Sequence, residues 1–380
     1  MATGITLCMM IKNEEMFLEK NLSKLSPICD DVIILDTGST DKSIEIASKY
    51  TKKILTNEFS GDFSAMRNSI LNKVDTPWIL YLDADEFFVD KDLESLPLLV
   101  KDAVSETQAY NFYRYNFFTN TAWNTSKLTI RLFRNRPEIA FRGKALESVF
   151  DSIMDINGGV DRATIPLNHF GLCKPVSSRR KKYEYYIALY KEELKKKPEN
   201  YLLYGYIALM LRNMGKLNEA LLTIEDVLKQ HPPSYISSAL LQYLYGQILR
   251  SSGESYKAIA AFERAATMTE NDPIFWNAVG VVRMERNEIN LAIDVFNKAI
   301  ALAPYLAHLY INKGLCHFIR RKYTDAYLSF ERAIVLDPSF LEHDWKNDSM
   351  MEAGEGFQYE TISDYKGLSY YNNKCLKEMN

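Results

Sequence analysis

The sequence predicts an α/β domain with a largely parallel sheet, followed by an all-α array of helical repeats. Over roughly the first 105 residues, short apolar runs alternate with amphipathic helical segments. This alternation is typical of parallel strands joined by crossover helices. Further along, the same residue types recur at an interval of 34 residues. A chain of 380 residues has room for two or three such domains.

Four apolar runs are the expected strands of the parallel sheet, at residues 5–11, 32–36, 53–55 and 78–83. Their nearly unbroken apolar character fits strands that are covered on both faces. The helices expected between them span residues 14–25, 39–50 and 62–74. The second of these helices has Ser or Thr available as its N-cap.

Residues 109–170 have a different pattern, because runs such as "LTIRLFRN" alternate between apolar and polar residues. We expect an antiparallel addition to the parallel sheet here. The run "YNFYRYNFFTNTAW" is rich in aromatic residues. Such a strand either packs the core or offers rings on which a sugar or a peptide stacks.

Gly, Ala and Phe recur in register in the last part of the chain. The recurring positions are Gly246, Gly280 and Gly314; Ala258, Ala292 and Ala326; Phe262, Phe296 and Phe330; and Ala265, Ala299 and Ala333. This is the tetratricopeptide pattern, in which small residues allow paired helices to approach closely and Phe fills the gap between hairpins. Such arrays usually bind peptides or proteins, although this one could instead only stabilise the first domain or a dimer.

These patterns predict four segments. They are a first domain at 1–172, a basic helical connector at 173–200, about four repeats at 201–340 and a capping segment at 341–380.

Composition excludes several classes of protein. The net charge of −3 gives no reason to expect nucleic acid as a partner. Five scattered cysteines form no metal or disulfide framework, which favours a reducing cytosol. No apolar run approaches the ~18 residues that span a bilayer, so we expect a cytoplasmic protein that is not transmembrane. P-loop, dinucleotide-binding and H-E-x-x-H motifs are absent from the sequence.

Acidic residues follow two of the expected strands. Asp36 ends the strand at 32–36, Asp83 ends the fourth strand, and Asp85 lies two residues further on. Because ligands of open parallel sheets gather at the carboxyl ends of the strands, we expect these aspartates to share one crevice around a single cation. Mg²⁺ or Mn²⁺ prefers oxygen ligands and would neutralise the diphosphate of a nucleotide sugar.

The segments "MMIKNEE", "VIILDTGSTDKS", "GDFSAMRNSIL", "WILYLDADE" and "FRGKALESV" occur in this order. Together they resemble the family-2 inverting glycosyltransferases of the nucleotide-diphospho-sugar (GT-A) fold. More narrowly, the chain is similar to the branch that carries C-terminal tetratricopeptide repeats. That branch includes peptide S-glycosyltransferases that modify bacteriocin precursors.

The resemblance implies a UDP-sugar site. Asp36 would contact the base or ribose, with Asn13 and Glu14 at the border of the same pocket. Arg67 would lie near the nucleotide, and Asp83 would hold the ribose or base.

The resemblance also implies a metal site and a base. Asp85 would bind the metal, and His169 in "PLNHFGL" would contact the metal or the diphosphate. Glu147 would be the catalytic base that an inverting transfer requires. Relatives usually read Val-His-Glu at this point, whereas this chain has Ala145 and Leu146 before Glu147.

We therefore expect a metal-dependent transferase that moves a sugar from a UDP-sugar to a Cys, Ser or Thr side chain of a peptide or protein. The repeats would hold this acceptor, and a homodimer is possible. One alternative acceptor is a glycan or a lipid-linked saccharide. Another alternative is an inactive transferase domain that serves as an interaction scaffold.

Overall fold

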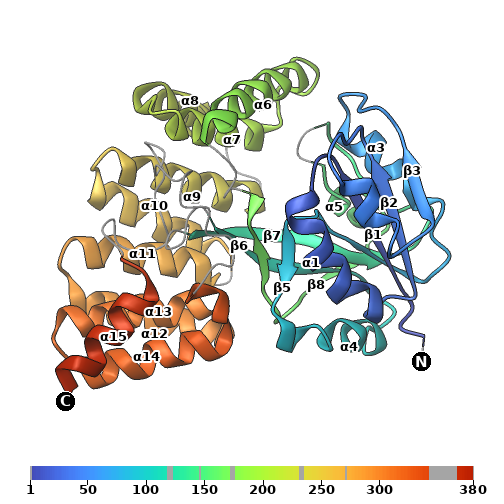
Figure 1. The fold of residues 1–380 in the computed structure, drawn as a ribbon. Coiled ribbons are helices and arrows are strands. Elements are labelled where there is room, and N and C mark those ends of the chain that lie inside the picture. The colour runs from blue at the N-terminus through green and yellow to red at the C-terminus, as the bar shows by residue number, and fades with distance from the viewer. Residues whose placement is uncertain are drawn as a thin grey trace. The chain divides into compact units, whose positions relative to one another are not determined.

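The structure is a computed structural model that describes residues 2–117, 123–144, 147–171, 176–230, 235–269, 272–341 and 366–379 (Figure 1). The chain divides into two compact units. Unit 1 comprises Met1–Asn116 and Ser126–Gly171, and unit 2 comprises Phe117–Thr125 and Leu172–Asn380. Ala145, Leu146 and most of the segment between the last repeat and residue 366 lie outside the described residues.

Unit 1 is built on a parallel sheet, as the sequence predicts. Its parallel strands are β1 (Ile5–Ile11), β2 (Asp31–Asp36), β3 (Lys53–Thr56) and β4 (Trp78–Tyr81). They lie in the order β3-β2-β1-β4, so β2 and β4 flank the central β1. The carboxyl ends of these strands therefore lie at one edge of the sheet.

The remaining strands extend the sheet beyond β4. They are β5 (Glu86–Phe88), β6 (Thr107–Phe117), β7 (Trp123–Arg134), β8 (Gly159–Arg162) and β9 (Leu167–His169). The antiparallel expectation holds for β4 with β7 and for β5 with β9. It is wrong for the pairs that β6 makes with β8 and β9, which are parallel; β6 also neighbours β7 in the sheet. The described aromatic residues of β6 are buried, in agreement with the core-packing interpretation.

Helices cover both faces of this sheet (Figure 1). They are α1 (Glu15–Leu25), α2 (Ser43–Ala47), α3 (Phe63–Leu71), α4 (Ser95–Lys101) and α5 (Phe150–Asp155). Side chains alternate along a strand, so Leu7 joins the core that includes Leu18 of α1. Its neighbour Cys8 joins the opposite core with Ile70 of α3. A sheet buried on both faces leaves its strand ends as the place for a ligand.

The second helix begins later than predicted. A helix from residue 39 with a Ser or Thr cap was expected, but α2 starts at Ser43 and Lys42 is its N-cap, without a side-chain cap bond. The Ser43 hydroxyl instead accepts a hydrogen bond from the backbone N–H of Glu14, at 2.7 Å. The residues before α2 thus form a loop that is tied to the end of β1.

The helical part of unit 2 begins with α6 (Val176–Lys196) and continues as paired helices (Figure 1). The pairs are α7 (Tyr201–Asn213) with α8 (Leu217–Gln230), α9 (Tyr235–Ser251) with α10 (Ser255–Thr267), α11 (Pro273–Glu285) with α12 (Ile289–Leu302), and α13 (Ala307–Ile319) with α14 (Tyr323–Leu336). The last described helix, α15 (Leu368–Met379), packs on α14, where the rings of Tyr371 and Phe330 meet.

The recurring Gly and Phe meet inside each pair of helices. A Cβ atom added to Gly280 of α11 would lie 2.5 Å from the Phe296 ring of α12, and Gly246 and Gly314 face Phe262 and Phe330 in the same way. Each ring thus packs on the glycine of its own hairpin, whereas the sequence analysis placed it between hairpins. Because the same contact forms in each of these hairpins, Gly and Phe recur at an interval of 34 residues.

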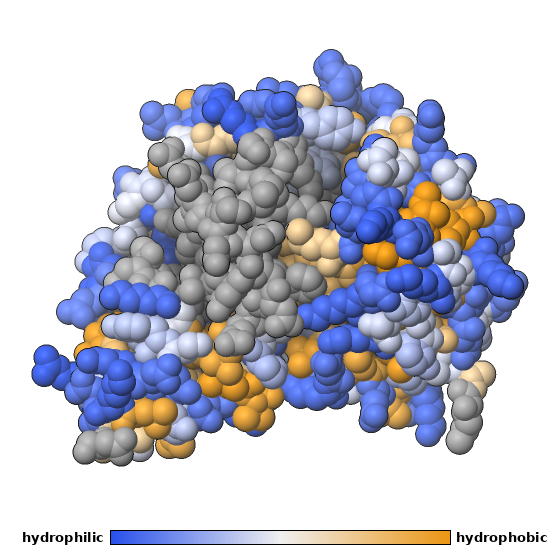
Figure 2. Space-filling model, in the orientation of Figure 1, coloured by the Kyte–Doolittle hydropathy of each residue, from blue (hydrophilic) through white to orange (hydrophobic). Residues whose placement is uncertain are grey.

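The visible surface is mostly hydrophilic, with small apolar patches between charged side chains (Figure 2). Large apolar side chains that are exposed on the repeats include Leu222, Tyr256 and Leu328. Single exposed apolar residues of this kind are normal on soluble proteins. Within the described part of the chain, we find no helix with the length and apolar character to cross a membrane.

Candidate functional site

The loop after β2 is held in shape by Asp36. This residue is only 1% exposed, and its carboxylate accepts hydrogen bonds from the backbone N–H groups of Gly38, at 3.0 Å, and Ser39, at 3.1 Å. Gly38 has a φ angle of +98°, which glycine adopts without strain. In this structure the carboxylate of Asp36 therefore orders its own loop.

Asn13 joins that loop to the end of β1. Its side-chain oxygen accepts a hydrogen bond from the backbone N–H of Thr40 at 2.7 Å, and its own N–H donates to Ser39 Oγ at 2.9 Å. The φ angle of Asn13 is +57°, a left-handed conformation that Asn tolerates better than most residues. Glu14 follows it as the N-cap of α1. Asn13, Glu14 and Asp36 therefore lie together at the ends of β1 and β2.

Asp83 lies between two arginines. Its two carboxylate oxygens accept hydrogen bonds from Nη2 of Arg67 at 2.9 Å and from Nη2 of Arg131 at 3.1 Å. Burial opposes ionisation, but these two guanidinium groups outweigh it and hold the pKa of Asp83 well below its usual range. The Asp83 side chain remains 31% exposed, so it can still accept a ligand hydroxyl.

Arg67 projects from α3 into the interior and is not a surface residue. Its side chain is only 5% exposed, and its guanidinium lies over the Tyr81 ring, 4.7 Å from the centroid. Besides Asp83 it binds Glu147, because Arg67 Nε donates to Glu147 Oε1 at 3.0 Å. Arg67 thus joins two predicted site residues that are far apart in the sequence.

Glu147 is a mostly buried carboxylate, with 16% of its side chain exposed. Burial raises the pKa of Glu147, although the neighbouring Arg67 acts in the opposite direction. A raised pKa makes a carboxylate a better proton acceptor near neutral pH. The ion pair with Arg67 fixes where that acceptor lies.

Sequence reasoning missed the buried charged residues that hold Asp83 and Arg131 in place. Glu86 is fully buried, and its carboxylate accepts hydrogen bonds from Arg131 Nε at 2.7 Å and from Arg114 Nη1 at 2.9 Å. Its oxygen also accepts from the backbone N–H of Asp83 at 3.1 Å. Glu86 is thus a buried counter-ion and not a ligand. Charged residues within the apolar strands β6 and β7 were the signal that could have revealed this network.

Asp85 and His169 face each other beside this network. Nε2 of His169 lies 3.5 Å from Oδ1 of Asp85, and Nδ1 of His169 lies 2.8 Å from the side-chain oxygen of Asn116. Gly171 packs against both side chains, because a Cβ atom there would lie 2.1 Å from Asp85 Oδ2 and 2.8 Å from His169 Nε2. Only a residue without a side chain can pack this closely against the pair.

This pair fits a divalent cation. A carboxylate and an imidazole nitrogen are both metal ligands, and glycine at position 171 lets the backbone approach them closely. No group of three or more His, Cys, Asp or Glu side chains with metal-binding geometry occurs among the residues that the structure describes. Asp36 is therefore not seen to join Asp85 around one cation. Two protein ligands suit an ion that also binds water and substrate phosphates.

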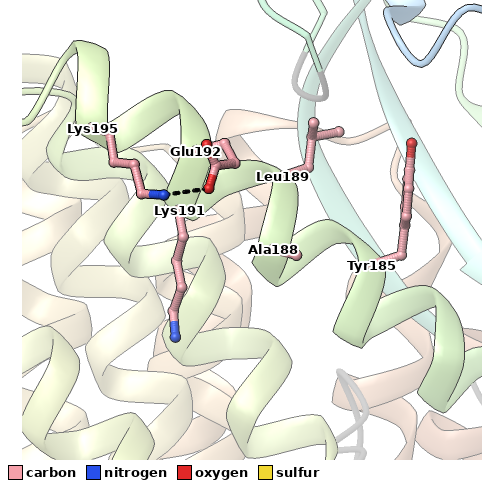
Figure 3. A pocket seen from close by; sticks show the side chains of 6 residues that line it. All are labelled: Tyr185, Ala188, Leu189, Lys191, Glu192 and Lys195. Atoms are coloured by element: carbon pink, nitrogen blue, oxygen red, sulfur yellow. Dashed lines mark hydrogen bonds and ion pairs between the residues drawn. The ribbon is translucent and has the colours of Figure 1, made fainter.

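A hollow lies on α6 of unit 2 (Figure 3). It has a volume of about 480 Å³ and is lined by Tyr185, Ala188, Leu189, Lys191, Glu192 and Lys195. Lys195 turns toward Glu192 and donates to its carboxylate at 2.5 Å (Figure 3). The described lining contains a single acidic residue, so it offers no ligand set for a cation.

Comparison with known families identifies both parts of the chain. Residues 6–159 match the family model described as "Glycosyl transferase family 2". Residues 207–273 and 243–307 match a model described as "Tetratricopeptide repeat". The chain thus carries a family 2 glycosyltransferase domain, a class that uses nucleotide-sugar donors, followed by tetratricopeptide repeats. The predicted family resemblance is confirmed.

Curated relatives share one or both parts. A TPR repeat-containing protein of Synechococcus elongatus is 28% identical, over 79% of this chain and 76% of the relative. The SPbeta prophage-derived glycosyltransferase SunS of Bacillus subtilis is 24% identical, over 61% of this chain and 54% of its own length. This chain therefore matches about half of SunS.

Solved structures resemble the repeats. The crystal structure of MamA covers 43% of this chain and 95% of its own chain, with a TM-score of 0.36 and 20% identity. YrrB, described as a TPR protein with an unusual peptide-binding site, covers 42% of this chain with a TM-score of 0.34 and 19% identity.

Proposed function

We propose that this protein is an inverting glycosyltransferase that moves a sugar from a UDP-sugar to a Cys, Ser or Thr side chain of a peptide or protein, of the kind represented by bacteriocin precursors. The observation that carries the proposal is the pairing of Asp85 with His169 at the strand ends of a family 2 domain, where Nε2 of His169 lies 3.5 Å from Oδ1 of Asp85. The repeats support a peptide acceptor, because arrays of this type usually bind peptides or proteins.

Asp85 and His169 would hold Mn²⁺ or Mg²⁺. When bound, such an ion neutralises the negative charge of the diphosphate leaving group. Asn13, Glu14 and Asp36 would border the uridine, with Asp36 acting through the backbone of the loop that it orders. The remaining nucleotide contacts would come from Arg67 and Asp83.

Glu147 would act as the base. The acceptor hydroxyl or thiol attacks the anomeric carbon while Glu147 takes its proton, and the bond from that carbon to the diphosphate oxygen breaks. Attack opposite the leaving group inverts the anomeric configuration. Because burial raises the pKa of Glu147, transfer to a hydroxyl should slow as the pH falls through this raised value. A thiol acceptor needs less help, since its own pKa is lower.

The reaction would take place in the cytosol. The cysteines that the structure describes, Cys8, Cys29, Cys316 and Cys375, are all free thiols. Free thiols suit a reducing compartment.

Donor binding can be tested with the full chain. UDP with Mn²⁺ should raise the melting temperature, since a ligand at 100 times its Kd stabilises a protein by about 2.7 kcal/mol. Asp85→Ala should abolish the Mn²⁺-dependent part of this shift, whereas Asp102→Ala, at an exposed position, should retain it. An unchanged shift in the Asp85 variant would contradict the metal role.

Transfer itself can be tested by mass spectrometry with UDP-sugars and matched panels of peptides and glycans. We expect a mass increase of one sugar on a peptide, lost in Glu147→Gln while UDP still binds. Transfer only to glycans would overturn the acceptor assignment. An absence of both transfer and Mn²⁺-dependent UDP-sugar hydrolysis would overturn the enzymatic proposal.

A further inference from the structure

Three side chains lie side by side on neighbouring strands beside the candidate metal site. In the register of the sheet, His169 of β9 pairs with Asn116 of β6 on one side and with Glu86 of β5 on the other. Directly paired residues project from the same face of a sheet. Glu86 is engaged with arginines, which leaves Asn116 as the neighbour that meets the imidazole.

The contact between Asn116 and His169 has a defined polarity. Nδ1 of His169 lies 2.8 Å from the side-chain oxygen of Asn116. Because an amide oxygen only accepts hydrogen bonds, this contact is a hydrogen bond when the proton of the neutral imidazole lies on Nδ1. The other ring nitrogen, Nε2, then carries a lone pair, and it is this atom that faces Asp85.

We propose that Asn116 is a positioning residue that fixes the Nδ1–H tautomer of His169 and thereby keeps Nε2 available as a metal ligand. The proposal deepens the proposed function, since it rests on Asp85 and His169 as the cation site. Hydrogen bonds of this kind orient the imidazole ligands of metal ions, and their loss typically weakens metal affinity 10–100-fold.

The alternative tautomer would close the site. With the proton on Nε2, the imidazole could donate to Asp85 Oδ1, which lies 3.5 Å away. A small rotation would form a direct hydrogen bond and occupy both ligand atoms. Asn116 is 4% exposed, so water has little access to replace its amide oxygen.

The tautomer can be measured without any metal. Histidine labelled with ¹⁵N gives two-bond ¹H–¹⁵N correlations that distinguish Nδ1–H from Nε2–H, and the spectra would be recorded at about pH 8. The chain has five histidines, and His169→Gln identifies the signal by its loss. We expect Nδ1–H in the wild type and a shift toward Nε2–H in Asn116→Ala. An Nε2–H wild type, or an unchanged Asn116→Ala, would overturn the proposal.

Metal affinity gives the second measurement, by Mn²⁺ titration followed by electron paramagnetic resonance. Asn116→Ala should weaken Mn²⁺ binding about 10–100-fold. Asn116→Asp should retain it within about threefold, because a carboxylate also accepts the Nδ1 proton. A merely structural role predicts the reverse, since burying a carboxylate costs more than burying a methyl group. An Asp variant that binds as poorly as Ala would therefore refute the positioning role.

Asn168→Ala is the matched control. Asn168 is also buried and precedes His169 in β9, so its side chain projects from the opposite face. Asn168→Ala should leave Mn²⁺ affinity within about threefold of the wild type. If it weakens Mn²⁺ binding as much as Asn116→Ala does, the effect comes from strand stability and the proposal is overturned. Wild-type Mn²⁺ affinity in both Asp85→Ala and His169→Gln would instead refute the cation site, while the tautomer measurement would still decide the role of Asn116.

Discussion

Replacing Glu86 by Gln should severely weaken unit 1. The Glu86 carboxylate is fully buried and accepts hydrogen bonds from Arg131 at 2.7 and 2.8 Å and from Arg114 at 2.9 Å. Gln has nearly the same shape but carries no charge, and its amide NH₂ group turns a donor toward guanidinium donors. The substitution therefore removes the counter-ion without creating a cavity.

The expected size follows from the burial. Removing one partner of a buried ion pair costs about 3–5 kcal/mol, because the remaining charge is left uncompensated. Arg131 keeps its bond to Asp83, and Gln keeps one accepting oxygen, so we expect the lower end of the range. About 3 kcal/mol corresponds to a change of roughly 100-fold in an equilibrium constant.

Hydrogen exchange followed by mass spectrometry can localise this loss. Amides of β5, β6 and β7 should exchange roughly 100-fold faster in Glu86→Gln, while peptides from the repeats serve as an internal reference. Glu106→Gln, at an exposed position, is the matched control and should change the stability by less than about 0.5 kcal/mol. Acceleration of less than about tenfold in β6 and β7 would refute the view that Glu86 is an essential counter-ion.

Three further predictions concern other residues. Gly171→Ala should weaken Mn²⁺ binding at least about tenfold by calorimetry, because its Cβ would lie 2.1 Å from Asp85 Oδ2 and would displace that carboxylate. Normal affinity would contradict the metal role of Asp85. The depressed pKa of Asp83 means that its ionised form stabilises the fold fully at neutral pH, and this contribution should be lost as the pH falls below about 5. In urea titrations, the unfolding free energy of Asp83→Asn should therefore depend less steeply on pH in acid than that of the wild type. Identical pH profiles would exclude this role. Gly280→Ala should cost about 1–3 kcal/mol of unfolding free energy, because the added methyl group overlaps Phe296. In a double-mutant cycle, Phe296→Leu should recover part of that loss. Strictly additive losses would contradict the contact.

The parallel half of unit 1 could be predicted from sequence because its signals are local. Unbroken apolar runs define β1, β2 and β4, and the acids that follow them define the strand ends. The start of α2 was predicted incorrectly, since Ser39 and Ser43 bind the end of β1 instead of capping a helix. Such bonds join segments about 30 residues apart, and no local pattern records them.

The supporting half of the site could not be predicted, because it depends on strand register. The sequence singled out Asp83, Asp85 and His169, but which side chains meet them is decided by the pairing of β5, β6 and β9. A shift of one residue in β6 would turn Arg114 and Asn116 to the opposite face. Short strands in a mixed sheet leave several registers open to sequence reasoning alone.

The placement of β9 has a consequence for how the protein is made. Asp85 lies near the start of the chain, but the strand that carries its partner comes about 80 residues later and is only three residues long. Closing so long a loop has an entropic cost, and the contacts that offset this cost form only after the loop has closed. A nascent chain can therefore build the β1–β4 sheet long before it can hold a cation, and we expect ion binding to emerge only after Gly171 has left the ribosome.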